Sequence, residues 1–350
     1  YDMTWLGKYQ FILGARYEDY EQNSKTSALS GEQEPIDVTL AQDDILPSLN
    51  FNWFITDSQQ LRFAVSQTVS RPDFKELANA VFYDVEFDIR VRGNPDLKIS
   101  SSWNYDVRWE KYWSDLETVS VALFYKDLTD PIERVVVPAS GTAGNSRTFI
   151  NADSAEIYGI EFDASWAIND NWFTSVGYTW LNAEYTKFES LTSSSTEVAR
   201  TQLAGNGGCL ELVDLNPDPA AIDNACRVNR KGNKIEDIPE HSLVGYLKWE
   251  TPIGKSDMNM FVDTNVIYAD ERYIEANNIK KLESYWLMDI RLGVVTTNWE
   301  VVLFVDNVTD DDTPRSGVDV GSQTETFRQG LFPPGPNDGY LVSLPPPRLY

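Results

Sequence analysis

The chain has 350 residues, a formal net charge of −25, 13% aromatic residues and two cysteines. Such an acidic chain is a poor partner for nucleic acid, because a phosphate backbone binds clustered positive charge. No run of about 18 apolar residues occurs, so the sequence contains no transmembrane helix. The length exceeds that of an average domain but suits one large β-barrel.

Apolar and polar residues alternate along eleven stretches of the chain, which indicates β-strands with one apolar and one polar face. In residues 104–112, for example, Tyr105, Val107 and Trp109 fall on one face and charged or amide residues fall on the other. The predicted strands are 9–20, 45–55, 60–69, 102–112, 117–128, 148–167, 172–186, 242–250, 257–269, 284–295 and 299–307.

Short turns and long polar segments alternate between these strands. The predicted turns are 56–59, 113–116, 168–171, 251–256 and 296–298, and the predicted long loops are 21–44, 70–101, 129–147, 187–241, 270–283 and 308–346. In an up-and-down sheet this order puts every short turn at one end, as in outer-membrane barrels. A soluble sandwich or propeller has no reason to sort its loops in this way. The sequence therefore predicts an all-β, antiparallel, up-and-down transmembrane β-barrel.

The alternation also predicts which side chains meet lipid. The expected lipid-facing residues are Val119, Val121, Leu123, Tyr125, Met258, Met260, Val262, Val266, Trp299, Val301, Leu303 and Val305. Charged residues of the neighbouring strands should face inward, namely Glu161, Asp163, Asp289 and Arg291. Tryptophans near strand ends are expected to form interfacial girdles. They are Trp53, Trp103, Trp113, Trp166, Trp172, Trp249, Trp286 and Trp299.

Residues that could carry chemistry are few. His241 is the only histidine and is interpreted as an ordinary residue at a strand entry. The acidic run 310–312 could bind calcium or form a solvated turn. Cys209 and Cys226 share one polar loop, which favours a disulfide in an oxidising compartment over two free thiols. No catalytic residue, metal site or cofactor is predicted.

Several segments resemble the TonB-dependent outer-membrane receptors in their order and spacing. They are Ser66–Phe74 (SQTVSRPDF), Gly93–Lys98 (GNPDLK), Ala122–Ile132 (ALFYKDLTDPI), Ala155–Glu161 (AEIYGIE), Phe304–Asp312 (FVDNVTDDD) and the lead-in Pro346–Tyr350. The resemblance implies a bacterial outer-membrane protein with a 22-stranded barrel. Residues 1–350 would then form the C-terminal part of that barrel, with 11 to 12 strands. Both ends look cut, so we expect a longer parent protein.

The resemblance also implies a function without covalent chemistry, so no enzyme is expected. The expected activity is uptake of a scarce, bulky nutrient, above all an iron–siderophore complex. The implied partners are the TonB–ExbB–ExbD complex, reached through the missing N-terminal region, the plug domain of the parent chain, outer-membrane lipid and lipopolysaccharide. The loop aromatics Phe82, Tyr83, Tyr185 and Tyr273 are candidates for stacking on the ligand or for packing within the loops.

Three alternatives remain open. The same family could import carbohydrate or another chelate. The chain could instead belong to a passive porin or a structural outer-membrane barrel. A membrane-embedded hydrolase would need His241 beside a serine at the lipid-facing rim.

Overall fold

The computed structural model describes residues 2–25, 37–84, 89–137, 146–191, 227–319 and 340–343. Twelve strands form one large antiparallel sheet in which each strand pairs with the next. These strands are β1 (Asp2–Trp5), β2 (Tyr9–Lys25), β3 (Asp37–Thr56), β4 (Gln59–Ser70), β7 (Ser100–Tyr112), β8 (Thr118–Thr129), β11 (Ser154–Asn169), β12 (Trp172–Lys187), β15 (His241–Pro252), β16 (Asn259–Ala269), β19 (Tyr285–Val295) and β20 (Glu300–Val305).

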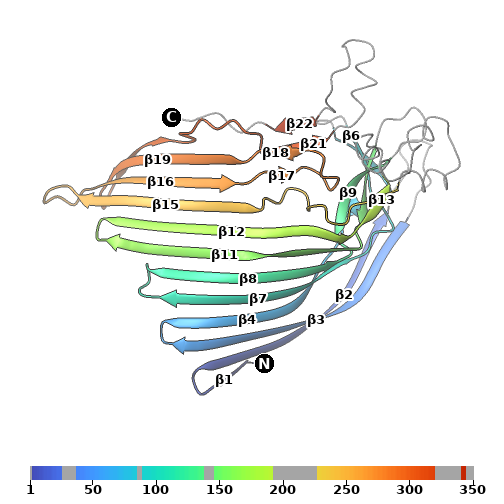
Figure 1. The fold of residues 1–350 in the computed structure, drawn as a ribbon, viewed down its shortest axis with the longest axis horizontal. Coiled ribbons are helices and arrows are strands. Elements are labelled where there is room, and N and C mark those ends of the chain that lie inside the picture. The colour runs from blue at the N-terminus through green and yellow to red at the C-terminus, as the bar shows by residue number, and fades with distance from the viewer. Residues whose placement is uncertain are drawn as a thin grey trace, which may run out of the picture.

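The sheet curves into an open wall, with β1 at one edge and β20 at the other (Figure 1). Short connections join neighbouring strands at one end, called here the turn end. The long connections gather at the opposite end, called here the loop end (Figure 1). The predicted sorting of turns and loops is therefore confirmed. The architecture is that of part of an up-and-down β-barrel.

The register places most of the large apolar side chains of the twelve strands on one face, although a few, such as Phe124, Phe261 and Phe304, lie on the other. Leu123 of β8, for example, lies between Val107 of β7 and Ile160 of β11, and all three point the same way. This outer face is exposed, with Leu123 at 51% and Leu303 at 69%. A monomer in water does not expose an apolar surface of this extent, whereas lipid accepts it.

The pairing confirms the predicted facing of the residues that lie in paired strands, whereas Met258 and Trp299 precede β16 and β20 and their facing stays a prediction. Glu161 and Asp163 lie opposite Ala122 and Ser120, on the face away from Leu123. Asp289 and Arg291 share that inner face. Seven of the eight tryptophans expected in the girdles are among the exposed residues: Trp53, Trp103, Trp113, Trp166, Trp172, Trp286 and Trp299.

Short elements cover the loop end. They are the helix α1 (Phe74–Leu77) and the strands β5 (Val81–Asp84), β6 (Ile89–Arg92), β9 (Ile132–Val137), β10 (Ser146–Asn151), β13 (Glu189–Leu191), β14 (Arg227–Asn229), β17 (Arg272–Tyr273), β18 (Lys281–Leu282), β21 (Ser316–Asp319) and β22 (Tyr340–Ser343). Four of them form a small sheet in the order β5-β6-β10-β9, in which β10 runs parallel to β6. Two loops that are separate in sequence are thereby joined.

Two predicted boundaries were wrong. The single strand expected over 148–167 is split into β10 and β11 at Ala152, which is fully buried and whose N–H donates to the carbonyl of Pro131 (2.8 Å). The loop expected over 21–44 is shorter, because β2 and β3 stay paired up to Lys25 and Asp37. Strands that extend beyond the bilayer meet water on both faces, so they lose the alternation that predicts strands inside it.

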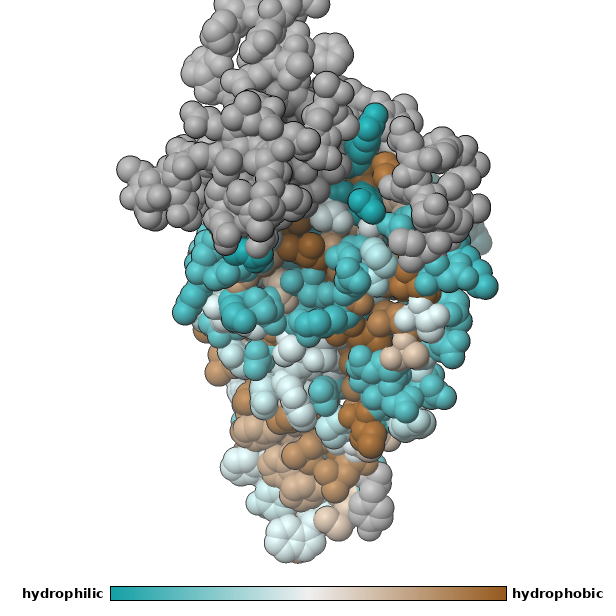
Figure 2. Space-filling model, turned by 90° about the vertical axis from the view of Figure 1, so that its right-hand side faces the viewer, coloured by the Kyte–Doolittle hydropathy of each residue, from teal (hydrophilic) through white to brown (hydrophobic). Residues whose placement is uncertain are grey.

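A compact hydrophobic core lies at the loop end. Its buried members are Val135, Ala152, Ala155, Tyr185, Phe188 and Ala276. They come from β9, β11, β12 and the connections that follow, so the core fastens the loop-end elements to the wall. Seen from the loop end, hydrophilic residues dominate the middle of the described surface, with some hydrophobic patches between them, and hydrophobic residues gather towards its lower end (Figure 2).

Candidate functional site on the inner face and at the loop end

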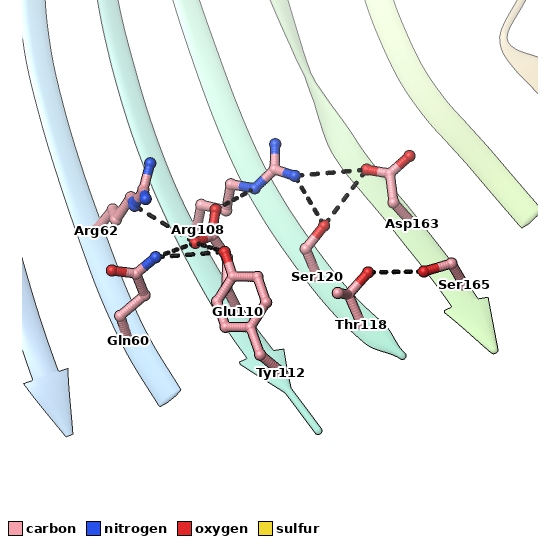
Figure 3. Close-up of polar contacts among 9 residues, drawn as sticks. All are labelled: Gln60, Arg62, Arg108, Glu110, Tyr112, Thr118, Ser120, Asp163 and Ser165. Carbon is pink, nitrogen blue, oxygen red and sulfur yellow. Dashed lines mark hydrogen bonds and ion pairs between the residues drawn. The ribbon is translucent and has the colours of Figure 1, made fainter. Parts of the chain in front are cut away.

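The inner face carries a polar network near the turn end, centred on Glu110 of β7 (Figure 3). Glu110 is 6% exposed and accepts hydrogen bonds from Gln60 and from the Tyr112 hydroxyl (2.6 Å). The Nε atoms of Arg108 and Arg62 lie 2.9 Å and 3.4 Å from its carboxylate oxygens. A desolvated carboxylate is tolerated only with such partners.

The network continues across the wall to β8 and β11 (Figure 3). Arg108 Nη2 donates to Ser120 Oγ (2.9 Å) and lies 3.8 Å from Asp163 Oδ2. Below it, the hydroxyls of Thr118 and Ser165 are 3.0 Å apart. The four strands therefore present a continuous polar surface. These groups can form hydrogen bonds with water or with a polar solute. They include no activated nucleophile or base arranged for covalent chemistry.

A second group of charges lies at the loop end. Arg147 of β10 is 3% exposed and pairs with Glu275, which is 6% exposed. Arg230, also 3% exposed, donates to Ser190, and its guanidinium lies 5.2 Å from the ring centre of Phe188. The buried Arg147–Glu275 ion pair is expensive to break, because one partner alone would be an uncompensated charge. These contacts hold segments together that are distant in sequence.

The buried carboxyl group of Glu133 and the partly buried one of Glu236 join this cluster. Burial raises the pKa of Glu133 to about 8, with a further contribution from Glu236, while Tyr185 and Arg230 act in the opposite direction. Burial likewise raises the pKa of Glu236 to about 7, although Arg134 opposes the change. Both groups therefore hold a proton more firmly than an exposed glutamate does.

Two arginines meet on an aromatic ring nearby. The guanidinium carbon of Arg315 lies 3.6 Å from the ring centre of Tyr285, and that of Arg272 lies 6.0 Å away. Arg272 Nη2 donates to the backbone carbonyl of Arg315. Asp237 Oδ1 is 3.7 Å from Arg272 Nε, and Asp311 Oδ1 is 3.3 Å from Arg315 Nη2.

The connection over 71–99 is fixed to the wall by two asparagines. Asn94 Nδ2 donates to the carbonyl of Phe149 (2.8 Å), and Asn151 Oδ1 accepts the N–H of Lys98 (2.9 Å). Such side-chain bonds replace the ladder that irregular backbone lacks. This connection is therefore a packed part of the loop end in its described residues.

The structure places the aromatic residues predicted as ligand candidates in three parts of the loop end, and their role in binding stays a prediction. Tyr185 is fully buried in the loop-end core, which fits the packing alternative. Tyr273 is partly exposed in β17, with Lys281 Nζ 4.7 Å from its ring centre. Phe82 is partly buried in β5, and Tyr83 follows it in the same strand.

His241 lies at the start of β15, as expected for a strand entry. Its Nδ1 is 2.7 Å from the Tyr178 hydroxyl and the two rings stack, so it is engaged by a tyrosine rather than a serine. This contact gives the hydrolase alternative no support. Cys209 and Cys226 lie outside the described residues, so their disulfide stays a prediction.

The acidic run fixes a turn at Asp311, which accepts the N–H groups of Trp286 (3.0 Å) and Thr313 (2.9 Å). Within the described ranges, no group of three or more histidine, cysteine, aspartate or glutamate side chains has a metal-binding arrangement. Among the same residues, no helix is long and apolar enough to cross a membrane.

Sequence reasoning missed the pairs Arg147–Glu275 and Arg272–Arg315. Their members are far apart in the chain and sit in connections without a periodic pattern, so no local signal identifies them. The turn that holds Asn94 could have been predicted, because the Gly-Asn-Pro-Asp segment is typical of a turn.

The two-faced antiparallel wall defines a class, the β-barrels that span the outer membrane. A sequence profile described as TonB dependent receptor-like, beta-barrel matches residues 1–308. The chain belongs to the TonB-dependent receptor family, whose members are transport receptors, and the protein is integral to the outer membrane.

Individual proteins agree with this assignment. The chain is similar to the ferric yersiniabactin uptake receptor FyuA from Yersinia pestis (15% identity, TM-score 0.62, covering 98% of this chain and 42% of that one). It is similar to the siderophore receptor PiuA from Acinetobacter baumannii (16%, 0.62, covering 88% and 38%). At these identities the likeness concerns the fold.

The chain is also similar to two further proteins. The copper transporter OprC matches with 14% identity and a TM-score of 0.62, covering 99% of this chain and 45% of that one. A curated protein, the iron-regulated outer membrane virulence protein of Vibrio cholerae serotype O1, is 34% identical over 101 residues, or 27% of this chain and 16% of its own length. The chain thus spans less than half the length of these relatives.

Proposed function

We propose that this chain forms part of the barrel wall of a receptor that imports an iron–siderophore complex across the outer membrane. The observation that carries the proposal is the polar network across β4, β7, β8 and β11 on the inner face, together with the packed described parts of the connections at the loop end. A bulky, water-soluble cargo needs such a surface along its route. The names of the V. cholerae relative and of the two siderophore receptors support iron as the cargo metal.

The proposed import draws its energy from the TonB–ExbB–ExbD complex. The parts that contact this complex, and the plug domain that closes the barrel, are proposed to belong to the parent protein. The loop end is proposed to face the outside of the cell, surrounded by lipopolysaccharide. Family membership supports this arrangement over a passive porin or a structural barrel, because the family takes its name from its dependence on TonB.

The fold itself does not select the cargo, since a copper transporter shares it. The test therefore uses the full-length parent protein in a bacterial strain that lacks its own siderophore receptors. Uptake of radioiron is measured with a panel of ferric siderophores, with and without a functional TonB. We expect TonB-dependent uptake of at least one complex.

Uptake that persists without TonB would overturn the proposal in favour of a passive pore. TonB-dependent uptake of copper chelates or oligosaccharides, with none of iron, would overturn the cargo and keep the active transport.

A further inference from the structure

Arg272 and Arg315 come from different connections and meet on the inner side of the loop end. Tyr285, the first residue of β19, is paired with Ala269 and so points to the inner face, opposite to Trp286. Both guanidinium groups lie by its ring, and Arg272 donates to the backbone of Arg315. Three segments thus bring two guanidinium groups to the same tyrosine ring.

Each of these arginines keeps a donor that no described residue accepts. The Arg272 side chain is 10% exposed and that of Arg315 is 22% exposed. The Nη1 atom of each is buried and has no hydrogen-bond partner in the part of the chain that the structure describes. A buried donor without an acceptor is unfavourable, and more so when it is charged. Each Nη1 atom therefore lacks the acceptor that a buried, charged donor requires.

The neighbouring acids leave part of the positive charge available. Asp237 is 59% exposed, so solvent screens its contact with Arg272. Asp311 already accepts the N–H groups of Trp286 and Thr313, and these bonds help to hold its pKa below the usual range. Its carboxylate is therefore shared among three donors. Asp237 and Asp311 therefore do not fully neutralise Arg272 and Arg315, and the two arginines can still attract a further anion.

We propose that Arg272 and Arg315 form a binding site for a carboxylate group at the loop end of the inner face. The planar fork of a guanidinium matches a carboxylate, and two forks against one aromatic ring favour a flat anion over a spherical one. Resting on the proposed function, we infer that this carboxylate belongs to the imported ligand. The ligand would then be a chelate with a free acid, or with carboxylate donors, rather than a neutral one.

The site can be tested without knowing the ligand. The purified full-length receptor is titrated with 4-fluorobenzoate and, separately, with the neutral 4-fluorobenzamide, and binding is followed by fluorine NMR. The variants are R272Q, R315Q and the control K281Q. Lys281 lies on the same β17–β18 hairpin and its loss removes the same charge, but it pairs with Glu271 rather than with Tyr285.

We expect benzoate to bind the wild-type receptor and K281Q, and to bind R272Q and R315Q at least about tenfold more weakly, which is about 1.4 kcal/mol. The benzamide should not compete. Absence of benzoate binding, equal weakening in K281Q, or equal binding of the benzamide would each overturn the site. R272Q and R315Q must keep the heat-modifiable mobility of the folded barrel, so that lost binding is not lost folding.

The transport assay separates the two proposals. Benzoate binding at the arginines with no TonB-dependent iron uptake would leave the anion site standing and overturn the proposed function. Iron uptake that is unchanged in both arginine variants would leave the function standing and overturn the assignment of the carboxylate to the imported ligand.

Discussion

Gly159 of β11 occupies a position where the wall has no room for a side chain. A Cβ atom there would lie 2.3 Å from the carbonyl oxygen of Trp180 and 2.9 Å from the Cα of Leu181. Both are backbone atoms of the paired strand β12, which cannot rotate away. We expect Gly159→Ala to destabilise the folded receptor by about 1–3 kcal/mol, the usual cost of overpacking. A lowered thermal midpoint in the heat-modifiability assay would measure it.

The matched control is Gly245→Ala on β15, where the nearest atom would lie at 3.9 Å. This variant should keep the wild-type midpoint. Equal midpoints for the two variants would show that β12 yields at Gly159.

Glu133 makes the loop end sensitive to pH. Its pKa is raised from 4.5 in an exposed chain to about 8 in the folded protein, mainly by burial. The folded state therefore binds more protons between these values, and the stability of the loop end falls as the pH rises through this window. Amide hydrogen exchange in β9, corrected for the intrinsic rate, should show less protection at about pH 9 than at about pH 6.

Glu133→Gln keeps the shape of the protonated acid and removes its titration. The variant should retain protection at the higher pH, apart from the part that Glu236 contributes. Charged groups that face these acids are Arg134, Arg147, Arg230, Asp237 and Glu275. A wild-type protein with the same protection at both pH values would contradict the assignment.

For single residues, the sequence predicts which face of the sheet a side chain points to better than it predicts which residues that side chain contacts. The alternation identified the outer position of Leu123 and the inner position of Asp163, because a strand in lipid has only two environments. It could not identify the burial of Tyr185 or Arg147, because their surroundings come from connections with no periodicity. Tyr185 accordingly figured as a possible ligand contact, although it is part of the loop-end core.

The strand β12 offers a direct test of the two faces. Val176 lies between Ala164 and Gly245 on the outer face, and the adjacent Ser175 lies between Ser165 and Tyr246 on the inner face. Val176→Arg should destabilise the folded barrel in a bilayer by about 2–4 kcal/mol. Ser175→Arg should cost far less, since it meets the polar interior. Urea titration of the receptor in liposomes would compare them, and a reversed order would contradict the facing.

The pair Cys209–Cys226 is a prediction about a connection that lies outside the described residues. A disulfide there would close a loop of about 17 residues, worth about 3 kcal/mol in the chain-entropy account. Its loss should weaken ligand binding more than it weakens the barrel, because a fastened loop loses less entropy on closing. Mass spectrometry of non-reduced peptides from the parent receptor decides the bond, and free thiols at both positions would contradict it.

Element boundaries were predictable where strands cross lipid and not beyond. The ends of β4, β7, β8 and β12 fell within about two residues of the alternating pattern. The small sheet β5-β6-β10-β9 was not foreseen. Its strands are short, and its parallel pair joins segments about 55 residues apart, a combination that local patterning does not encode.

The molecule as a whole is an open sheet with two free edges in its described part, β1 and β20. Unpaired N–H and C=O groups are not tolerated in hydrocarbon, and edges in water invite aggregation. We therefore expect residues 1–350, expressed alone, to fail to insert stably into liposomes. Protease resistance and heat-modifiable mobility report insertion, and a protected, heat-modifiable species would contradict the prediction.

The parallel pairing of β6 with β10 has a practical consequence for engineering. The connection before β7 and the connection between β8 and β11 share one small sheet, so each completes the hydrogen bonding of the other. Replacing only one of these connections with that of a relative would leave β6 or β10 without the strand it pairs with. Chimeric receptors and loop-derived vaccine antigens built from this protein should therefore carry both connections together as one transplantable unit.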